Sequence, residues 1–251
     1  MRSPLDLLQE SFSLSLKMPA IIFTVVYIVI ALLSTLAVAA IGAVIALAGI
    51  FVLALINNLT LNIIATIGAL AVAAVILIIL NAVFEIIFYK GLHQVSKKGS
   101  HDFSEIKGTI AKRIGPLIVF NVIVLVLVLL LSGIIAVPLY FLLNKIGIAI
   151  AVALIGFIVF LASPLFIIGV PLIILENEGA LASLGITVRT GLANYLFNIT
   201  SIVLLIIVCF ITVLISLIPI LGWAIAFLVA IFEGIYLIRI YEENRQRAYR
   251  G

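Results

Sequence analysis

The chain has 251 residues, of which 66% are hydrophobic and only 10% are charged, and its mean hydropathy is +1.50. A soluble domain carries about 25% charged residues, so this composition excludes a soluble globular protein. It also excludes a disordered chain, and the single cysteine, Cys209, excludes a disulfide-stapled scaffold. The sequence therefore predicts an all-α polytopic membrane protein, whose net charge of +4 reflects basic residues that lie beside apolar segments.

A transmembrane helix needs about 20 apolar residues, and the chain offers six such runs, which we expect to pair as three hairpins. The number of spans in residues 20–56 is ambiguous, because this apolar run is long for one span and short for two. We expect one span with an outer extension, and a re-entrant segment is the alternative. The predicted spans cover about residues 20–46, 63–89, 116–136, 146–175, 195–217 and 223–240.

The basic residues predict the orientation of these spans. With both termini in the cytoplasm, every Lys and Arg except Lys145 falls on the inner side, as the positive-inside rule requires. We therefore expect a multi-pass cell-membrane protein with cytoplasmic N- and C-termini. The basic inner face is expected to contact anionic lipid headgroups, and we expect no nucleic acid partner.

Three cytoplasmic segments carry large apolar residues at the spacing i, i+3, i+7, i+11. At 100° per residue each set forms one stripe on a helix. A helix of this kind lies in the headgroup plane with its apolar stripe toward the acyl chains. The expected lipid-facing residues are Leu5, Leu8, Phe12 and Leu16, then Phe103, Ile106, Ile110 and Ile114, and finally Leu181, Leu184, Val188 and Leu192.

These segments suggest an internal repeat within a single membrane domain, residues 1–251. Each unit would be one interfacial amphipathic helix followed by a two-span hairpin, with boundaries at 1–98, 99–176 and 177–251. The second and sixth spans also end alike, in FEIIF at 84–88 and FEGIY at 232–236. The alternative is a chance match, because apolar sequence has little complexity.

Short motifs in the second half of the chain carry a family resemblance. Residues 171–181 read PLIILENEGAL, an amphipathic segment and a span follow, and residues 219–222 read PILG. With the order of hairpins, these resemble the six-helix prokaryotic integral membrane proteins related to the membrane domain of glycerophosphoryl diester phosphodiesterases. The segment after Gly179 departs from the family's usual serine spacing. The resemblance implies a fold over most of the chain and no reaction.

Glu85 and Glu233 are carboxylates inside predicted spans, and such residues are functional candidates because their insertion is unfavourable by about 2.5–3.5 kcal/mol at mid-helix. In one interpretation, each forms an ion pair that pins an interfacial helix to a span. In the other, they couple to protons or cations during transport. The basic residues close enough in the predicted topology to pair with them are Lys90, Arg113, Arg189 and Arg239.

Other polar or helix-breaking residues inside the spans predict local structure. Pro164 and Pro171 each remove a backbone hydrogen bond, so we expect kinks in the fourth span. Asn121 and Asn198 are expected to form interhelical hydrogen bonds, with a polar path through the bundle as the alternative.

Three function classes remain after these observations. The chain contains no GxxxxGK[ST], HExxH or GxSxG motif, and its two histidines, His93 and His101, lack a set of metal ligands around them. We therefore expect no metal, no cofactor and no enzyme activity. A non-catalytic component is favoured, either an accessory subunit bound to other membrane subunits or to itself, or a lipid-organising protein. The alternatives are a small-solute or ion transporter that uses Glu85 and Glu233, and an intramembrane lipid enzyme.

Overall fold

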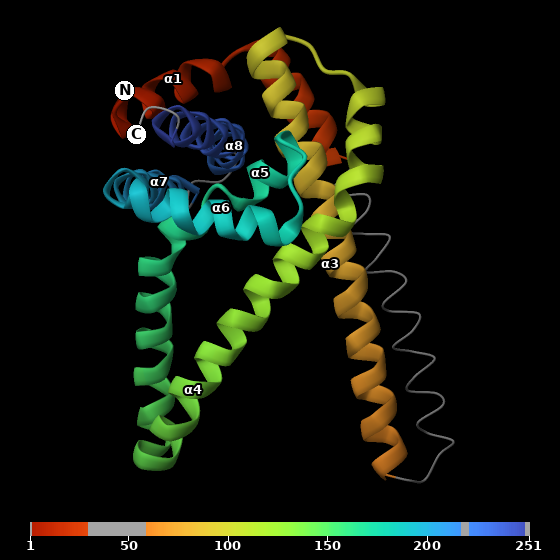
Figure 1. Ribbon diagram of the computed structural model, residues 1–251, viewed down its shortest axis with the longest axis vertical. Helices are drawn as coiled ribbons and strands as arrows, with labels where there is room; N and C mark the ends of the chain where they lie inside the picture. Colours follow the sequence, from red (N-terminus) through yellow and green to blue (C-terminus); the bar gives the residue numbers. More distant parts are fainter. Residues whose placement is uncertain (1, 30–58, 217–220, 249–251) are drawn as a thin grey trace.

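The computed structural model describes residues 2–29, 59–216 and 221–248, and its regular secondary structure there is entirely helical. This confirms the all-α class. The helices, shown in Figure 1, are α1 (Pro4–Ser15), a helix at Met18–Val29, α3 (Leu59–Lys98), α4 (Phe103–Phe166), α5 (Gly169–Leu175), α6 (Ala180–Ala193), α7 (Tyr195–Ser216) and α8 (Leu221–Ala248).

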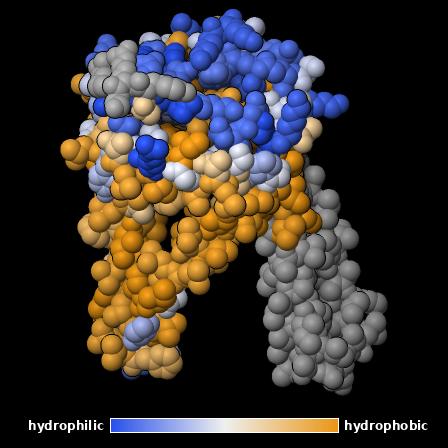
Figure 2. Space-filling view, in the orientation of Figure 1, coloured by the Kyte–Doolittle hydropathy of each residue, from blue (hydrophilic) through white to orange (hydrophobic). Residues whose placement is uncertain are grey.

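The helices divide into a polar cap and apolar arms. We define the polar cap as α1, α5, α6 and the adjoining ends of α3, α4 and α8; both chain ends lie beside it in Figure 1. The arms are the rest of α3 and α4, which run away from the cap in the plane of that view, whereas α7 and α8 run along the line of sight. Figure 2 shows hydrophilic residues gathered over the cap and hydrophobic residues along the two limbs of α4. Helices that are apolar on all sides suit a lipid environment.

The long helix α4 contains the hairpin predicted from the third and fourth spans. Its regular geometry breaks at Asn144, which has φ 52 and ψ −133. Asparagine tolerates a positive φ better than most residues, because its short side chain can hydrogen-bond locally. Figure 1 shows α4 running away from the cap and returning toward it. The turn therefore falls beside Lys145, where the sequence predicts an outer connection.

Several helices are long and apolar enough to cross a membrane, which identifies a multi-pass membrane protein. Within the described residues these are Val75–Lys98, Phe103–Leu175 and Tyr195–Ile215. The pair Pro4–Ser15 and Met18–Val29, bent by 77°, adds a fourth if it forms one broken span. The structure thus establishes fewer spans than the six expected. Most of the first predicted span, and the choice between one span and a re-entrant segment at 20–56, lies outside the described residues.

The helices also continue beyond the predicted spans. The second predicted span ends near Tyr89, but α3 continues to Lys98 without interruption. The amphipathic segment that begins at Phe103 is likewise the start of α4 and not a separate helix. The ends of both helices thus carry polar residues into the cap.

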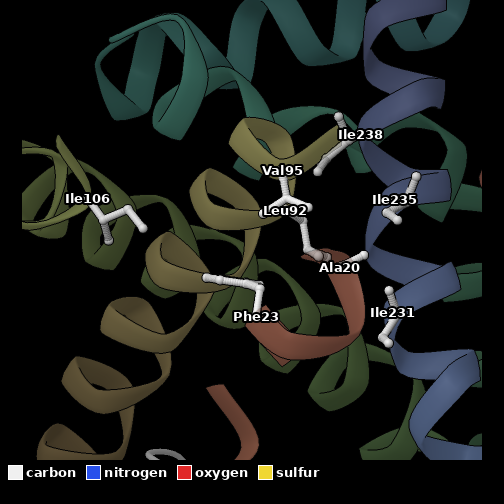
Figure 3. Packing of buried hydrophobic residues seen from close by; sticks show 8 residues of the cluster. All are labelled: Ala20, Phe23, Leu92, Val95, Ile106, Ile231, Ile235 and Ile238. Carbon is white, nitrogen blue, oxygen red and sulfur yellow. The ribbon is translucent and has the colours of Figure 1, made fainter. Parts of the chain in front are cut away.

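Aliphatic clusters fix the arms to the cap. The cluster drawn in Figure 3 joins the helix Met18–Val29, the end of α3, the start of α4 and α8. Its buried members are Ala20, Phe23, Leu92, Val95, Ile106, Ile231, Ile235 and Ile238. Burying an aliphatic side chain stabilises by about 1.5–3 kcal/mol, so these contacts anchor the cap.

Each of the three amphipathic segments packs on helices from another part of the chain. Leu7 of α1 lies in a core with Phe197 of α7 and Tyr236 of α8. Ile106, at the start of α4, packs against α3, and Gly191 of α6 lies against α4. The first segment thus attaches to α7 and α8, the second to α3 and the third to α4, and these contacts close the cap as a ring.

Candidate functional site

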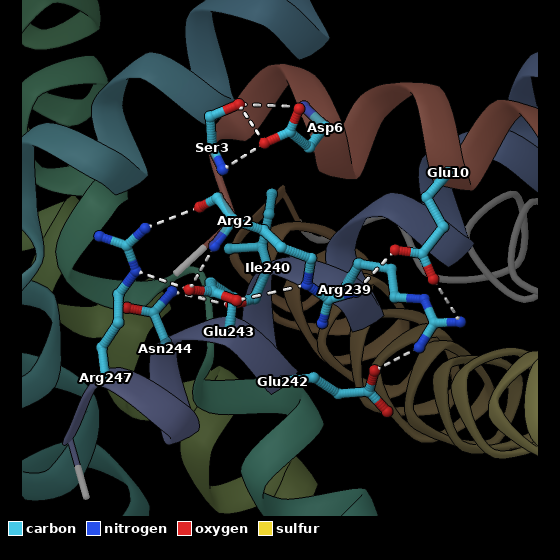
Figure 4. A network of polar contacts seen from close by, with 10 residues as sticks. All are labelled: Arg2, Ser3, Asp6, Glu10, Arg239, Ile240, Glu242, Glu243, Asn244 and Arg247. Atoms are coloured by element: carbon cyan, nitrogen blue, oxygen red, sulfur yellow. Dashed lines mark hydrogen bonds and ion pairs between the residues drawn. The ribbon is translucent and has the colours of Figure 1, made fainter. Parts of the chain in front are cut away.

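The polar cap is held together by ion pairs that link α1 to α8 (Figure 4). Glu10 of α1 accepts from Arg2 at 2.6 Å and pairs with Arg239 of α8 at 3.0 Å. Arg239 also reaches Glu242 at 2.6 Å. A second acid of α8, Glu243, is almost fully buried and accepts the backbone N–H of Arg2 at 3.1 Å. The start of the chain is therefore fixed to α8 by charge-assisted hydrogen bonds.

Glu242 extends this network to α3. Lys97 Nζ lies 3.1 Å and His93 Nε2 lies 3.5 Å from the Glu242 carboxylate. Burial alone would raise the pKa of Glu242, but hydrogen bonds from His93, Arg239 and Lys97 outweigh it and hold the pKa at about 2. The carboxylate therefore stays ionised at any physiological pH and joins α3 to α8.

A cavity of about 520 Å³ opens among these charged groups in the cap. Four cations line it, Arg2, Lys97, Arg239 and Arg245, together with the acids Glu176 and Glu242. Each cation already pairs with an acid; Arg245, for example, lies 2.5 Å from Glu176. Because every one of these cations is matched by an acid inside or beside the cavity, we assign its residues a structural role in cross-linking α1, α3, α5 and α8.

The turn between α3 and α4 has its own polar contacts. Lys90 pairs with Glu105 at 2.7 Å, and Gln94 donates to the same carboxylate at 2.7 Å. The hydrogen bond and charge of Lys90 lower the pKa of Glu105. Asp102 caps α4 by accepting from the backbone N–H groups of Ser104 and Glu105. Lys90 is thus bound to the start of the second amphipathic segment.

Glu85 does not pair with any of the four expected basic residues in the described structure. Asn121 donates to its carboxylate at 3.0 Å, which confirms Asn121 as a link between α3 and α4. The expected ion pair is absent because the basic residues have partners nearer the cap. Lys90 pairs with Glu105, Arg239 pairs with Glu10 and Glu242, and Arg113 donates to the side chain and backbone oxygens of Asn177, each at 2.8 Å.

Glu233 is also without an ion pair to any described residue, and it lines a cavity of about 300 Å³. The cavity lies where the helix Met18–Val29, α3 and α8 meet. Its polar lining groups are Glu233, Thr24, Tyr27 and Tyr89. The fourth expected partner, Arg189, is exposed on α6. Within the described part of the chain, no ion pair thus joins Glu85 or Glu233 to any of the four expected basic residues.

The fourth span is interrupted between the two prolines that predicted a kink. The arm of α4 ends at Phe166, just after Pro164, and α5 begins at Gly169, just before Pro171. Asn198 of α7 donates to the Pro164 carbonyl at 3.1 Å and accepts from Asn244 of α8 at 2.7 Å. The amide of Asn198 thus caps the interrupted helix and ties it to α7 and α8, as an interhelical hydrogen bond should.

The first and third amphipathic segments turn most of their predicted apolar stripes outward. Leu5, Phe12 and Leu16 are 63%, 57% and 50% exposed, and Leu181 and Leu192 of α6 are 71% and 62% exposed. Leu8, Leu184 and Val188 are half-buried. The opposite faces, which bury Ser11, Ser15, Ser183 and Thr187, were not predicted, because serine and threonine give no core signal in a sequence.

The second amphipathic segment differs, and here the lipid-facing prediction is wrong. Ile106 is 3% exposed and lies in the core, while Ile110 and Ile114 are half-buried against neighbouring helices. Only Phe103 of this stripe is exposed. The reason is that the segment continues directly into the arm of α4 and lies along α3, so its stripe meets protein.

Comparisons of the chain with protein-family models, with curated proteins and with solved structures gave no match.

Proposed function

We propose that the chain is a non-catalytic, six-span membrane protein that organises lipid at the cytoplasmic leaflet, with the polar cap on the inner side. The observation that carries this proposal is the three-faced surface of α1. Leu7, Ser11 and Ser15 are buried against the protein; Leu5, Phe12 and Leu16 are exposed and apolar; Asp6, Gln9 and Ser13 are exposed and polar.

Three faces of this kind suit a helix at a membrane surface. One face binds the protein, one meets the acyl chains and one meets water. In water the exposed apolar face would be unfavourable by about 25 cal/mol for each Å². The protein-facing side is fixed to α8 by the Glu10–Arg239 pair, so the helix is held in one orientation.

Charge on the cap supports contact with anionic headgroups. Several exposed basic side chains in or beside the cap have no ion pair with a described acid. They are Lys17, Lys107, Lys112 and Arg189. A basic residue close to an anionic surface contributes about 1 kcal/mol to binding, which favours an inner-leaflet location.

The test uses spin labels on α1 in a Cys209→Ser background, with the protein in vesicles that contain anionic lipid. Phe12→Cys carries the label on the apolar face, and Ser13→Cys is the matched control on the polar face. We expect the Phe12 label to be reached by oxygen and shielded from a water-soluble nickel reagent, and the Ser13 label to behave in the opposite way. A Phe12 label accessible to the nickel reagent contradicts the proposal. A label shielded from both reagents indicates a partner subunit and favours the accessory-subunit alternative.

Transport is the second candidate function, because Glu233 lines a cavity inside the apolar region. It predicts solute or ion flux in reconstituted liposomes that is lost in Glu233→Gln while the protein remains folded. Flux that is absent in the wild type, or equal in the variant, counts against this candidate.

The resemblance to the phosphodiesterase-associated membrane domain likewise stays a proposal, supported by the hairpin of α4 and the order of the elements.

A further inference from the structure

The cavity beside Glu233 has the composition of a binding site for an organic cation. It is about 300 Å³ in volume, and it lies among three helices that are far apart in the sequence. Its lining combines one carboxylate, three aromatic rings, two of them phenols, and the hydroxyl group of a threonine with aliphatic side chains; the polar and aromatic residues are Thr24, Tyr27, Phe88, Tyr89 and Glu233. A mostly apolar pocket with a few convergent polar groups is typical of small-molecule sites.

The aromatic rings at this cavity lie at angles to one another. The ring centroids of Tyr27 and Phe88 lie 4.9 Å apart with their planes inclined by 40°. Phe88 and Tyr89 are 5.9 Å apart and inclined by 76°. Rings that meet at angles in this way can surround a ligand, as in the aromatic cages that bind quaternary ammonium groups through cation–π attraction.

The carboxylate of Glu233 supplies the negative charge that such a cage needs. It has no hydrogen bond or ion pair with another described residue, although a lone carboxylate in an apolar region is strongly unfavourable. Glu85 differs, because Asn121 donates to it. A bound cation would satisfy Glu233 without any movement of the cap ion pairs.

Thr24 gives an independent indication that the cavity is built for a ligand. Its side chain is fully buried, and its Oγ1 atom has no hydrogen-bond partner among the described residues. It lines the same cavity as Glu233. Buried hydroxyl groups are nearly always hydrogen-bonded, so this orphaned Oγ1 atom is available to accept a hydrogen bond from a guest such as a protonated tertiary amine.

Close packing of α3 on α8 builds one wall of this site. A Cβ atom on Gly234 would lie 2.5 Å from Cε1 of Phe88. The glycine next to Glu233 therefore lets the Phe88 ring lie against the backbone of α8. Aromatic ring and carboxylate are thereby brought to the same cavity from different helices.

We propose that this cavity binds the ammonium group of a tertiary or quaternary organic cation, with Glu233 as counter-ion and Tyr27, Phe88 and Tyr89 as the cage. A divalent metal fits less well, because Mg²⁺ and Ca²⁺ need six or more oxygen ligands, and the described residues hold no cluster of three His, Cys, Asp or Glu side chains. Glu233 lies six residues before Arg239, about 9 Å along the helix from the cap. At that depth either a free cation or the ammonium group of a lipid headgroup can reach Glu233.

This proposal depends on the cavity and not on the lipid-organising function.

The test measures binding of tetraethylammonium to the full chain in nanodiscs made only of phosphatidylglycerol, which has no amine. We expect saturable binding that is weakened about tenfold or more in Glu233→Gln and severalfold in Tyr27→Leu, because these variants remove the counter-ion and one ring of the cage. Glu178→Gln, outside the cavity, is the matched control and should bind as the wild type does. Tyr27→Leu keeps the test decisive if Glu233→Gln fails to fold.

A second arm identifies the source of the ammonium group. Native mass spectrometry of the protein from its own membrane, before and after tetraethylammonium is added, shows whether an amine-headed lipid is retained and displaced. Displacement that depends on Glu233 assigns the site to a lipid headgroup, and tetraethylammonium binding without a retained lipid assigns it to a free cation. Two results overturn the proposal: neither ligand binds the wild type, or both bind equally well to Glu233→Gln.

Discussion

Gly191 of α6 lies so close to Leu165 of α4 that a Cβ atom on the glycine would be 2.7 Å from the Leu165 Cα. The same atom would lie 3.0 Å from the carbonyl oxygens of Leu165 and Pro164. These are backbone atoms at the interruption of the fourth span and cannot move independently. At this point α6 approaches the backbone of α4 so closely that the position has no room for a side chain.

The first prediction follows from this contact. Gly191→Ala should lower stability by about 1–3 kcal/mol, because the methyl group overpacks a backbone contact. Gly185→Ala on the same helix has open space around it and should be neutral or stabilise by up to about 1 kcal/mol. Thermal unfolding in detergent measures both. Equal midpoints for the two variants would show that α6 does not pack on α4 as described.

Asn198 provides the second prediction. Asn198→Ala removes the donor to the Pro164 carbonyl and the acceptor for Asn244, and should destabilise by about 1–3 kcal/mol because it leaves buried polar groups unpaired. Thr200→Val is the control: the Thr200 side chain is exposed and bonds only to the Leu196 carbonyl one turn earlier. A double-mutant cycle with Asn244→Ala should show coupling, and strict additivity would contradict the network.

The third prediction concerns pH. The pKa of Glu242 is about 2 in the folded protein against an ordinary value of 4.5, so the unfolded chain binds this proton first as pH falls. Its contribution to stability is full above about pH 4.5 and is lost as the pH approaches 2. Unfolding midpoints measured across this range should fall less steeply in Glu242→Gln than in the wild type. Glu178→Gln should keep the wild-type slope, and a parallel curve for Glu242→Gln would refute the assignment.

The fourth prediction tests the orientation in the membrane. In a Cys209→Ser background, Lys145→Cys at the α4 turn should react with a membrane-impermeant maleimide added outside intact cells. Lys98→Cys at the cap end of α3 should react only after the membrane is opened. The reason is that the positive-inside rule places the cap in the cytoplasm and the turn outside. Labelling of both sites from the same side would overturn the proposed topology.

Hydropathy predicted the helical class, the hairpin of α4 and the position of α7, because a long apolar run has few alternatives to a membrane helix. Periodicity predicted that Leu5, Phe12 and Leu16 share one face. It could not separate lipid from protein as the partner of that face, which is why the same spacing was misleading at Ile106. An apolar stripe in a sequence indicates a helix face that avoids water, but it does not indicate whether lipid or protein covers that face.

The partners of the charged residues were harder to predict. Glu85 and Glu233 were expected to attract nearby basic residues, but Lys90 and Arg239 extend toward the cap and bind Glu105, Glu10 and Glu242 instead. Long side chains can reach partners on neighbouring helices, and which partner lies within reach depends on how the helices pack. The i, i+4 spacing of Glu243 and Arg247 is a local signal in the sequence that predicts their ion pair. No local signal of this kind predicts the pairing of Arg2 with Glu243.

The ring of the cap also dictates an order of events during synthesis. Arg2 and Glu243 are 241 residues apart, so α1 leaves the ribosome long before the surface that it binds. Until α7 and α8 are inserted, Leu7 and the small hydroxyl residues of α1 lack their protein partners, and the helix can rest on the lipid surface through its apolar stripe. The contact that closes the ring is therefore the last to form, and a chain interrupted before α7 leaves its first helix without a docking surface.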